Sequence, residues 1–328
     1  RVSEEVQLFV RLPRKESNMC TFIIACLISL SALSLSSCTQ KKVATSVAYM
    51  DFPQTIELKA RVQPLDTALF RYPFRVRVQG DKAVVMDLHG TDYFCHVFHY
   101  PGFRYFASFG KRGEAPEEML SAENIRWHGQ SLWGLDAGKS VLTKYDFTSS
   151  GCSIVPQKVI NMDADMLRVL DFVMVDDFTF IVPDGSGSSR FCWVNYQGKL
   201  LRRTGQIPSA NAEALQNARP ALAQAWRSFI DYNPRNGVLA AVTQLGEVLE
   251  VFNLKDSTHV VRIGPHGEPE FKISQGYGIP TGIMGFSDVQ VAVLSMRFFM
   301  GALLRKLRKM YSKVSICRME DGISMFLV

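Results

Sequence analysis

A unit of about 50 residues recurs along this chain and constrains its fold more than any other feature. Each copy contains short runs rich in Val, Phe, Tyr and Trp, separated by turns of Gly and small or acidic residues, as is typical of antiparallel β-hairpins. One polar residue ends an apolar strand in each copy, at Asp87, Asp136, Asp184 and Thr243. These positions are 49, 48 and 59 residues apart.

A period near 50 residues with about four strands per copy predicts an all-β protein, a β-propeller of four-stranded antiparallel blades. About four to five blades can be read in frame over residues 51–291. The longest interval contains residues 210–226, ANAEALQNARPALAQAW, which predict a helical insertion on both sides of Pro220. We expect its apolar face to pack on the blades.

Glycines at three-residue steps follow the outer strand of two copies, with Gly110 and Gly113 before Pro116, and Gly264 before Gly267. We expect positive φ there, which lets the chain turn into the next blade. The F-G-x-x-G-x-x-P-x-x-M run resembles NHL-type propeller repeats, and residues 19–291 resemble the TolB-like six-bladed β-propeller lipoproteins of Gram-negative bacteria. The resemblance implies six blades and a lipid tether, and it supplies no catalytic residue.

The N-terminal region reads as a lipoprotein signal. After an upstream segment, residues 1–18, residues 19–37 form an apolar run that is short for a bilayer span and fits a signal peptide. Leu35 to Cys38, LSSC, resemble the bacterial lipobox, in which the cysteine is acylated. Acyl chains there would hold the protein at a membrane. We therefore expect a lipid anchor at Cys38, a tether over residues 38–50 and a bacterial envelope location facing the periplasm.

The net charge of +6 is concentrated at the ends of the chain. Residues 292–328 carry a net charge of +5 and residues 1–18 a net charge of +1, so residues 19–291 sum to zero. A neutral body without a basic stripe argues against nucleic acid as a partner.

The cysteines of the body indicate neither a disulfide framework nor a zinc site. Cys95, Cys152 and Cys192 are scattered and lack C-x-x-C spacing, so we interpret them as buried thiols, with one disulfide pair left open.

No motif in the body predicts a catalytic or metal site. His89, His96 and His99 cluster near Asp92, but His96 and His99 are three apart on a strand and point to opposite faces. The run GYGIPTG at 276–282 is interpreted as a loop, and the acidic stretch 163–177 as a solvated strand pair and not a calcium loop. We therefore expect no metal and no cofactor.

Two function classes remain open. The first is a binding or scaffolding module that recognises a protein, peptide or glycan while a lipid holds it at the membrane. The alternative is a propeller enzyme of the lactonase or lyase type, with acid, base or metal-ligating residues from several blades converging on the central channel. The small supply of His and Asp in the body favours the first class.

The repeat stops abruptly at residue 292, where a basic tail, residues 292–328, begins. A reading frame shifted by two nucleotides can restore strand-and-turn sequence there, although freely chosen codons contribute to that agreement. Our hypothesis is that this tail is out of frame and replaces the last blades, which the nucleotide sequence would decide.

Overall fold

The computed structural model describes residues 45–48, 70–148, 153–291, 296–300, 315–318 and 324–327. The chain divides into two units, residues 1–43 and residues 44–328, and every described residue belongs to the second.

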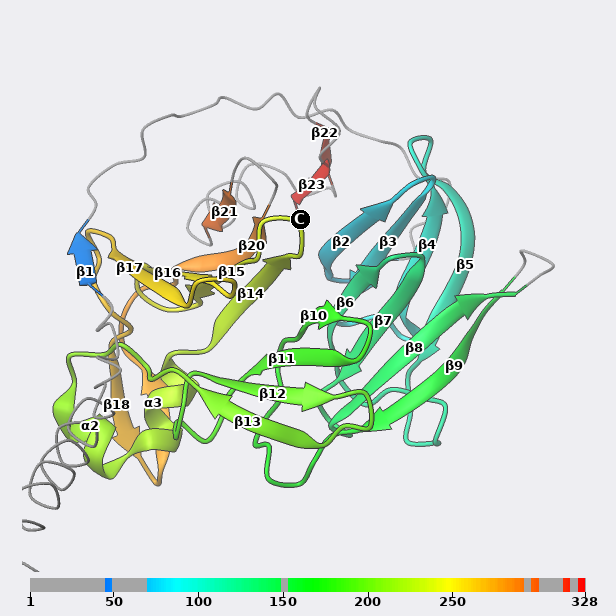
Figure 1. Ribbon diagram of the computed structural model, residues 1–328. Helices are drawn as coiled ribbons and strands as arrows, with labels where there is room; N and C mark the ends of the chain where they lie inside the picture. Colours follow the sequence, from blue (N-terminus) through cyan, green and yellow to red (C-terminus); the bar gives the residue numbers. More distant parts are fainter. Residues whose placement is uncertain are drawn as a thin grey trace, which may run out of the picture. The chain divides into compact units, whose positions relative to one another are not determined.

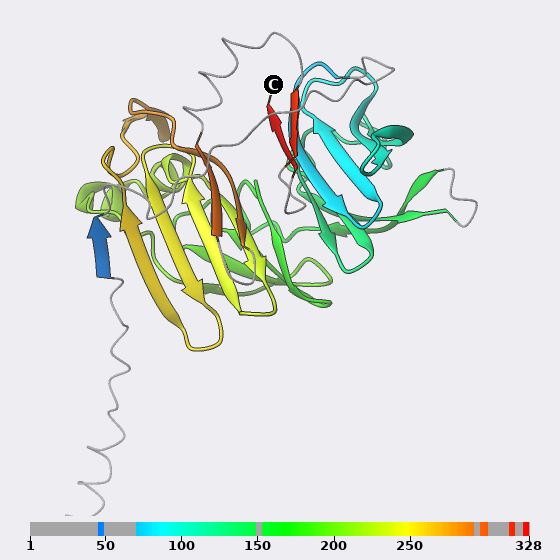
Figure 2. The same cartoon turned by 90° about the horizontal axis from the view of Figure 1, so that it is seen from above.

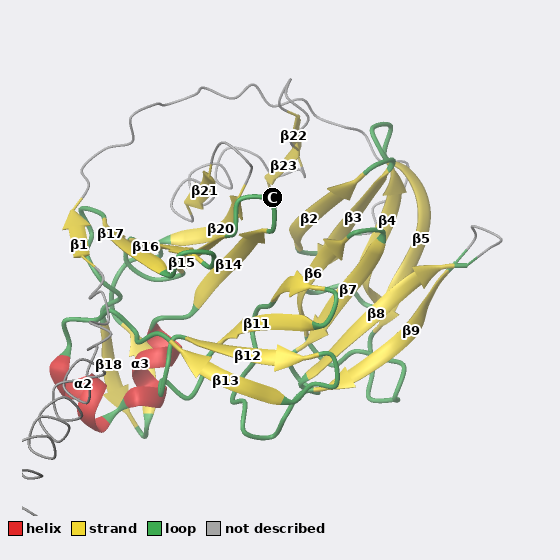
Figure 3. Cartoon of the chain, in the orientation of Figure 1, coloured by secondary structure: helices red, strands yellow, loops and turns green. Residues whose placement is uncertain are grey.

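Four antiparallel sheets of four consecutive strands dominate the described residues, and they are arranged as propeller blades (Figures 1 and 3). Blade 1 comprises β2 (Pro73–Gln79), β3 (Lys82–Asp87), β4 (Tyr93–His99) and β5 (Arg104–Lys111). Blade 2 comprises β6 (Ala122–His128), β7 (Ser131–Asp136), β8 (Val141–Phe147) and β9 (Ile154–Asn161). Blade 3 comprises β10 (Val173–Asp176), β11 (Thr179–Pro183), β12 (Phe191–Asn195) and β13 (Leu200–Thr204). Blade 4 comprises β14 (Ser228–Asn233), β15 (Val238–Thr243), β16 (Val248–Asn253) and β17 (Thr258–Ile263). The predicted all-β propeller with four-stranded blades is confirmed.

The core lies between neighbouring blades. The second strand of each blade is almost continuously apolar and buried, because both of its faces are covered by adjacent sheets. Between blades 1 and 2, for example, Met86 and Phe94 belong to the same cluster as Ile125 and Tyr145. Burial of such side chains is worth about 1.5–3 kcal/mol each, so contact between blades is the main source of stability.

The polar residues that align the sequence copies occupy equivalent positions at or just after the end of the second strand. The Asp136 carboxylate accepts hydrogen bonds from the amides of Leu120, Ser121, Gly138 and Lys139 at 2.8–3.2 Å. Asp87, Asp184 and Thr243 likewise accept bonds from backbone amides of their own blades. These residues therefore fix the turns around the end of the second strand, which explains why the repeat preserves a polar residue there.

The helical insertion predicted for residues 210–226 is confirmed as α2 (Ala212–Asn217) and α3 (Arg219–Ala225). The Asn211 side chain caps α2, and Pro220 lies in the first turn of α3, where its missing amide costs nothing. Leu222 and Trp226 are buried with Val248 of blade 4, so the insertion packs on that blade as expected. A hairpin of β18 (Phe271–Ser274) and β19 (Tyr277–Pro280) packs against α3.

Three further strand pairings complete the description. β1 (Thr45–Ala48), within the predicted tether, pairs with β17 in parallel and makes blade 4 five-stranded. β20 (Phe286–Val291) pairs with β21 (Met296–Met300), beyond the point where the sequence repeat stops. β22 (Ser315–Arg318) pairs with β23 (Ser324–Leu327). The four complete blades agree with the four to five blades predicted for residues 51–291, whereas β21 lies in the segment interpreted from the sequence as the basic tail.

Of the four glycines expected to have positive φ after the outer strands, Gly110, Gly113 and Gly267 have it and Gly264 does not. Gly110 has φ of 65° at the end of β5, and Gly205 and Gly267 have φ of 72°. At Gly110 a Cβ atom would also lie 2.8 Å from the Met119 sulfur. The positive φ therefore favours glycine at this exit from blade 1, and an added Cβ atom would also have to displace the flexible Met119 side chain.

Candidate functional site: the axial ion-pair network

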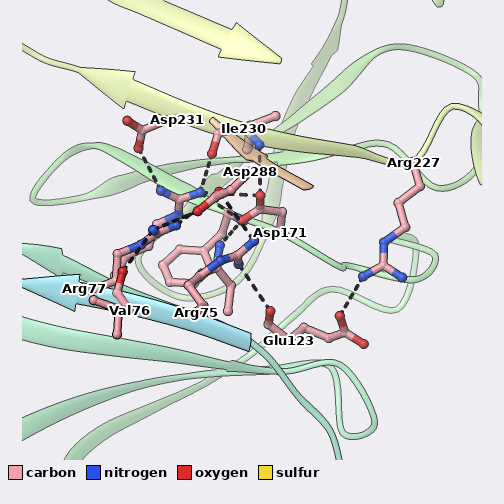
Figure 4. A network of polar contacts seen from close by, with 12 residues as sticks. Arg75, Val76, Arg77, Glu123, Asp171, Arg227, Ile230, Asp231 and Asp288 are labelled. Carbon is pink, nitrogen blue, oxygen red and sulfur yellow. Dashed lines mark hydrogen bonds and ion pairs between the residues drawn. The ribbon is translucent and has the colours of Figure 1, made fainter. Parts of the chain in front are cut away.

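Six charged side chains from the first strands of blades or from the segments next to them meet in one network, which we call the axial network (Figure 4). The first strands of blades 1 and 2 supply the arginines, and the segment before β10, together with β14 and β20, supplies the aspartates. Its members are Arg75, Arg77, Arg126, Asp171, Asp231 and Asp288. With three charges of each sign, the axial network is neutral.

Arg126 joins three blades within the axial network. Its Nη1 donates to Asp231 Oδ1 at 2.8 Å, and its Nη2 donates to Asp171 Oδ1 at 3.1 Å. Nη2 also donates to the backbone carbonyl of Ile230. Asp171 in turn accepts from the Ile230 amide at 2.9 Å and from the Asn124 side chain. Blades 2, 3 and 4 are thus connected by charge-assisted hydrogen bonds, which are about twice as strong as neutral ones.

Asp288 connects β20 to blade 1. Arg77 binds the Asp288 carboxylate with both terminal nitrogens, and Arg75 Nη2 lies 3.5 Å from Asp288 Oδ1. Burial alone would raise the pKa of Asp288, but Arg75 and Arg77 outweigh it and hold this pKa at about 2. Burial lowers the pKa of Arg75 to about 10, which leaves that side chain a cation at neutral pH.

Asp231 has the opposite electrostatic balance. Burial raises its pKa, and Arg126 offsets this only in part. Its second oxygen accepts a hydrogen bond of 2.7 Å from the Val291 amide, so this carboxylate also holds the end of β20. Every carboxylate of the axial network is therefore engaged by an arginine, and the arrangement is suited to joining blades.

A second buried network lies between blades 3 and 4. Arg190 Nε donates to Glu250 Oε1 at 2.7 Å, and Arg190 Nη2 donates to the Ser228 hydroxyl at 2.7 Å. His259 Nε2 lies 3.2 Å from the other Glu250 oxygen, with its ring stacked on Phe252. These contacts again pair groups from adjacent strands and blades.

The predicted histidine cluster does not converge on one point. His96 is buried and its Nδ1 lies 2.8 Å from the Ser108 hydroxyl, whereas His99 Nδ1 lies 3.9 Å from an Asp81 oxygen. The His89 ring packs edge-on against Tyr72. Within the described ranges, no group of three or more His, Cys, Asp or Glu side chains is placed to hold a metal ion.

Two sequence interpretations are corrected. The run at 276–282 is not a loop, because Tyr277–Pro280 forms β19, whose Gly278 amide donates to the Gln224 side chain. The stretch 163–177 is not a strand pair, because only Val173–Asp176 is a strand. Residues before it form a turn that buries Met166 and Val169, and Asp163 accepts amide bonds from Asp165 and Leu200.

Two of the three body cysteines, Cys95 and Cys192, lie among the described residues. Cys95 and Cys192 are buried free thiols, as interpreted from the sequence, and burial raises the pKa of both, to about 12 for Cys192. Cys152 lies outside the described residues. So do Cys38, the predicted signal peptide and most of the basic tail. Across the described part of the chain, no helix is both long and apolar enough to cross a bilayer.

Sequence reasoning missed the axial network. Its partners are at least 45 residues apart, so they form no local motif. A signal was nevertheless present, because Arg77 lies between Val76 and Val78 in β2, and Asp231 lies between Ile230 and Tyr232 in β14. Charges at such positions need buried partners, although the pattern does not identify them.

Several solved structures are similar to this chain at low sequence identity. One is a candidate exported protein of Bacteroides fragilis, at 9% identity over 66% of this chain and 80% of that chain, with a TM-score of 0.42. Another is a candidate 6-phosphogluconolactonase of the same organism, at 12% identity over 79% and 70%, with a TM-score of 0.42. A third is the β-propeller domain of Cps50 (Swd1) from Myceliophteria thermophila, at 10% identity over 82% and 68%, with a TM-score of 0.42.

A search of curated proteins found no match. The family model described as TolB-like 6-blade propeller-like matches residues 51–312, most of the chain. That match includes all four blades and the inner strands that carry the axial network. The chain therefore belongs to the TolB-like 6-blade propeller family.

Proposed function

We propose that this protein is a lipid-anchored propeller of the bacterial envelope that binds a partner protein at one rim of its blades. Each blade has two rims. The turns between the first and second strands and between the third and fourth strands, such as β16 to β17, form the turn rim. The turns between the second and third strands lie at the other end, together with the connections between blades, and form the connection rim. The connection rim carries the elements that break the repeat, namely α2, α3 and the β18–β19 hairpin.

The exposed face of the β18–β19 hairpin carries the proposal. Gly278 lies against α3, where a Cβ atom would meet the Ala221 carbonyl. Because side chains alternate along a strand, Tyr277 and Ile279 lie on the opposite, outward face, and they are 56% and 39% exposed. Lys272 pairs with Ile279 across the hairpin and shares this face. An aromatic residue beside an apolar one with a charged neighbour is typical of a protein interface.

The axial network supports a binding module over a channel enzyme. A general base or metal ligand must be free to reach a substrate. In the described part of the chain, the axial carboxylates Asp171, Asp231 and Asp288 are all held by arginines instead.

Site-specific photocrosslinking in cells tests the binding role. A photoreactive amino acid at Lys272 should give a discrete protease-sensitive adduct, whereas the same probe at Lys199, on the turn rim, should not. Tyr277→Ala should weaken the adduct formed from position 272. A protease-resistant adduct would identify a glycan and contradict the protein partner, and equal adducts from both positions would contradict a specific surface.

Fatty-acid labelling tests the anchor separately. The LSSC sequence at 35–38 supports acylation of Cys38. Wild-type protein should incorporate a fatty-acid probe and Cys38→Ala should not, with Cys26→Ala as the matched control that retains labelling. Equal incorporation in wild type and Cys38→Ala would contradict the anchor.

A further inference from the structure

We infer that the turn rim faces the membrane, so that blade 4 contacts the phospholipid surface through its β16–β17 and β14–β15 turns. This orientation rests on the lipid anchor proposed at Cys38. It follows from where the chain enters the propeller and from the side chains that lie at that end.

The direction of β1 sets the point of entry. β1 pairs in parallel with β17, with Thr45 opposite Val260 and Ala48 opposite Ile263. Thr45 therefore lies beside the start of β17, close to the β16–β17 turn. In Figure 2 the β16–β17 and β14–β15 turns lie at one end of the blade 4 strands, and the helices lie at the other end.

The chain between the anchor and β1 is short. Thr45 is seven positions after Cys38, and seven steps along the chain span at most about 25 Å when fully extended. The strand that begins at Thr258 is six residues long, or roughly 20 Å from rim to rim. A tether that enters at the turn rim therefore keeps this rim next to the bilayer and carries the connection rim away from it.

The side chains at this corner suit a phospholipid surface. Arg235, in the β14–β15 turn, and Lys255, in the β16–β17 turn, are both exposed, and Lys255 Nζ donates to the Arg235 carbonyl at 3.0 Å. Two adjacent cations favour an anionic headgroup region. The exposed carboxylate of Asp256 in the same turn is hydrogen-bonded to the neutral side chains of Asn253 and Thr258, so these three charged side chains together have a net charge of +1.

An exposed aromatic residue lies on the same rim. Phe178, in the β10–β11 turn, is 70% exposed, more than any other large apolar side chain among the described residues. The first turn of every blade lies on the rim that also carries its last turn, because successive strands are antiparallel. Aromatic rings at headgroup depth are a common feature of proteins held at a bilayer interface.

Fluorescence quenching by a spin-labelled lipid tests this orientation. Lipidated full-length protein, with Cys152 and Cys317 replaced by serine, receives a fluorophore at Lys255→Cys or at Ser274→Cys on the connection rim. It is then reconstituted in vesicles of phosphatidylethanolamine and phosphatidylglycerol that contain a headgroup-labelled nitroxide lipid. We expect quenching at 255 to exceed quenching at 274 by about threefold or more, since the rims are a strand length apart.

A vesicle flotation step separates the two proposals. Protein that does not float with vesicles contradicts the lipid anchor itself. Protein that floats but shows equal quenching at both positions, or stronger quenching at 274, overturns the orientation and leaves the anchor standing. Arg235→Glu combined with Lys255→Glu should reduce quenching at a third label, Phe178→Cys, while flotation persists.

Discussion

Arg77 on β2 binds the carboxylate of Asp288 on β20 through two contacts, Nη1 to Oδ2 at 2.9 Å and Nη2 to Oδ1 at 3.4 Å. The two residues are 211 positions apart in the sequence. This pair joins the first described blade to the strand that follows the fourth, and Phe74 of β2 packs in the same cluster as Phe286 of β20. The first described blade is thus held to β20 by one polar and one apolar contact.

Replacing Asp288 should destabilise the protein more than replacing Arg77. Asp288→Asn leaves both Arg75 and Arg77 without their anionic partner, and breaking a buried pair in this way costs about 3–5 kcal/mol. Arg77→Gln leaves Asp288 paired with Arg75 and should cost less. Urea unfolding measures both free energies. Lys199→Ala, at an exposed position, should change stability by no more than about 0.5 kcal/mol. Equal losses for the two axial variants would contradict the shared-partner geometry.

Acid should weaken the fold partly through Asp288. The folded-state pKa of Asp288, about 2, lies below its ordinary value of 3.8. The contribution of Asp288 to folding stability is therefore present above pH 3.8 and is lost as the pH falls toward 2. The size of that contribution is about 2 kcal/mol. Urea unfolding between about pH 5 and pH 2 should therefore show a shallower acid loss for Asp288→Asn than for wild type.

Asp231 should change the pH dependence of the unfolding free energy in the opposite direction. The pKa of Asp231 is raised in the folded state. Its contribution to folding stability is therefore fully present at pH values below its ordinary pKa, and it is lost as the pH rises through the folded-state pKa. Asp231→Asn should consequently make the acid loss steeper than in wild type. Parallel pH profiles for Asp231→Asn and Asp288→Asn would argue against the assigned environments.

Asp136→Ala should be among the most destabilising changes outside the axial network. The carboxylate accepts four backbone amides around the end of β7, and an amide that loses its acceptor without gaining a water costs about 1–3 kcal/mol. Asp136→Asn retains an acceptor oxygen and should lose less stability. Thermal unfolding of the two variants provides the comparison, and a neutral Asp136→Ala would show that the carboxylate does not fix the turn.

Gly110→Ala should cost more than Gly129→Ala. Both glycines have positive φ, 65° and 55°, so both variants incur about 1–2 kcal/mol of backbone strain. Only at Gly110 does the added carbon meet the Met119 sulfur, whereas nothing lies within 4 Å of it at Gly129. The difference in unfolding free energy therefore measures the packing at the exit from blade 1, and equal costs would mean that Met119 moves aside freely.

The sequence predicted the blades well because the repeat is local. A polar residue such as Asp136 lies within 20 residues of every amide that it binds, so the same spacing reappears in each copy. The helices at 210–226 were predicted for the same reason, since Ala and Leu content acts over one segment. The run at 276–282 was misjudged because β19 is stabilised by contact with Gln224 of α3, which lies 54 residues away.

The axial network could not be predicted from the sequence, because its ion pairs join residues that are far apart along the chain. Arg126 contacts Asp171 and Asp231, 45 and 105 residues further along the chain, and only the ring of blades brings them together. Lipid attachment at Cys38, the domain boundaries at both ends and the origin of the basic tail stay predictions, because they fall on residues outside those described or on chemistry that a fold does not report.

The pairing of β1 with β17 has a consequence for the order of folding. β1 is synthesised before any blade, yet its partner Val260 emerges roughly 215 residues later, so closing this loop is an entropically costly, non-local step. Blades 1 to 3 are built from neighbouring hairpins and can form before β1 pairs with β17. An N-terminal strand that has not yet found β17 has an unpaired backbone, so an interruption of synthesis before blade 4 would leave an intermediate with an exposed edge, prone to association with other chains.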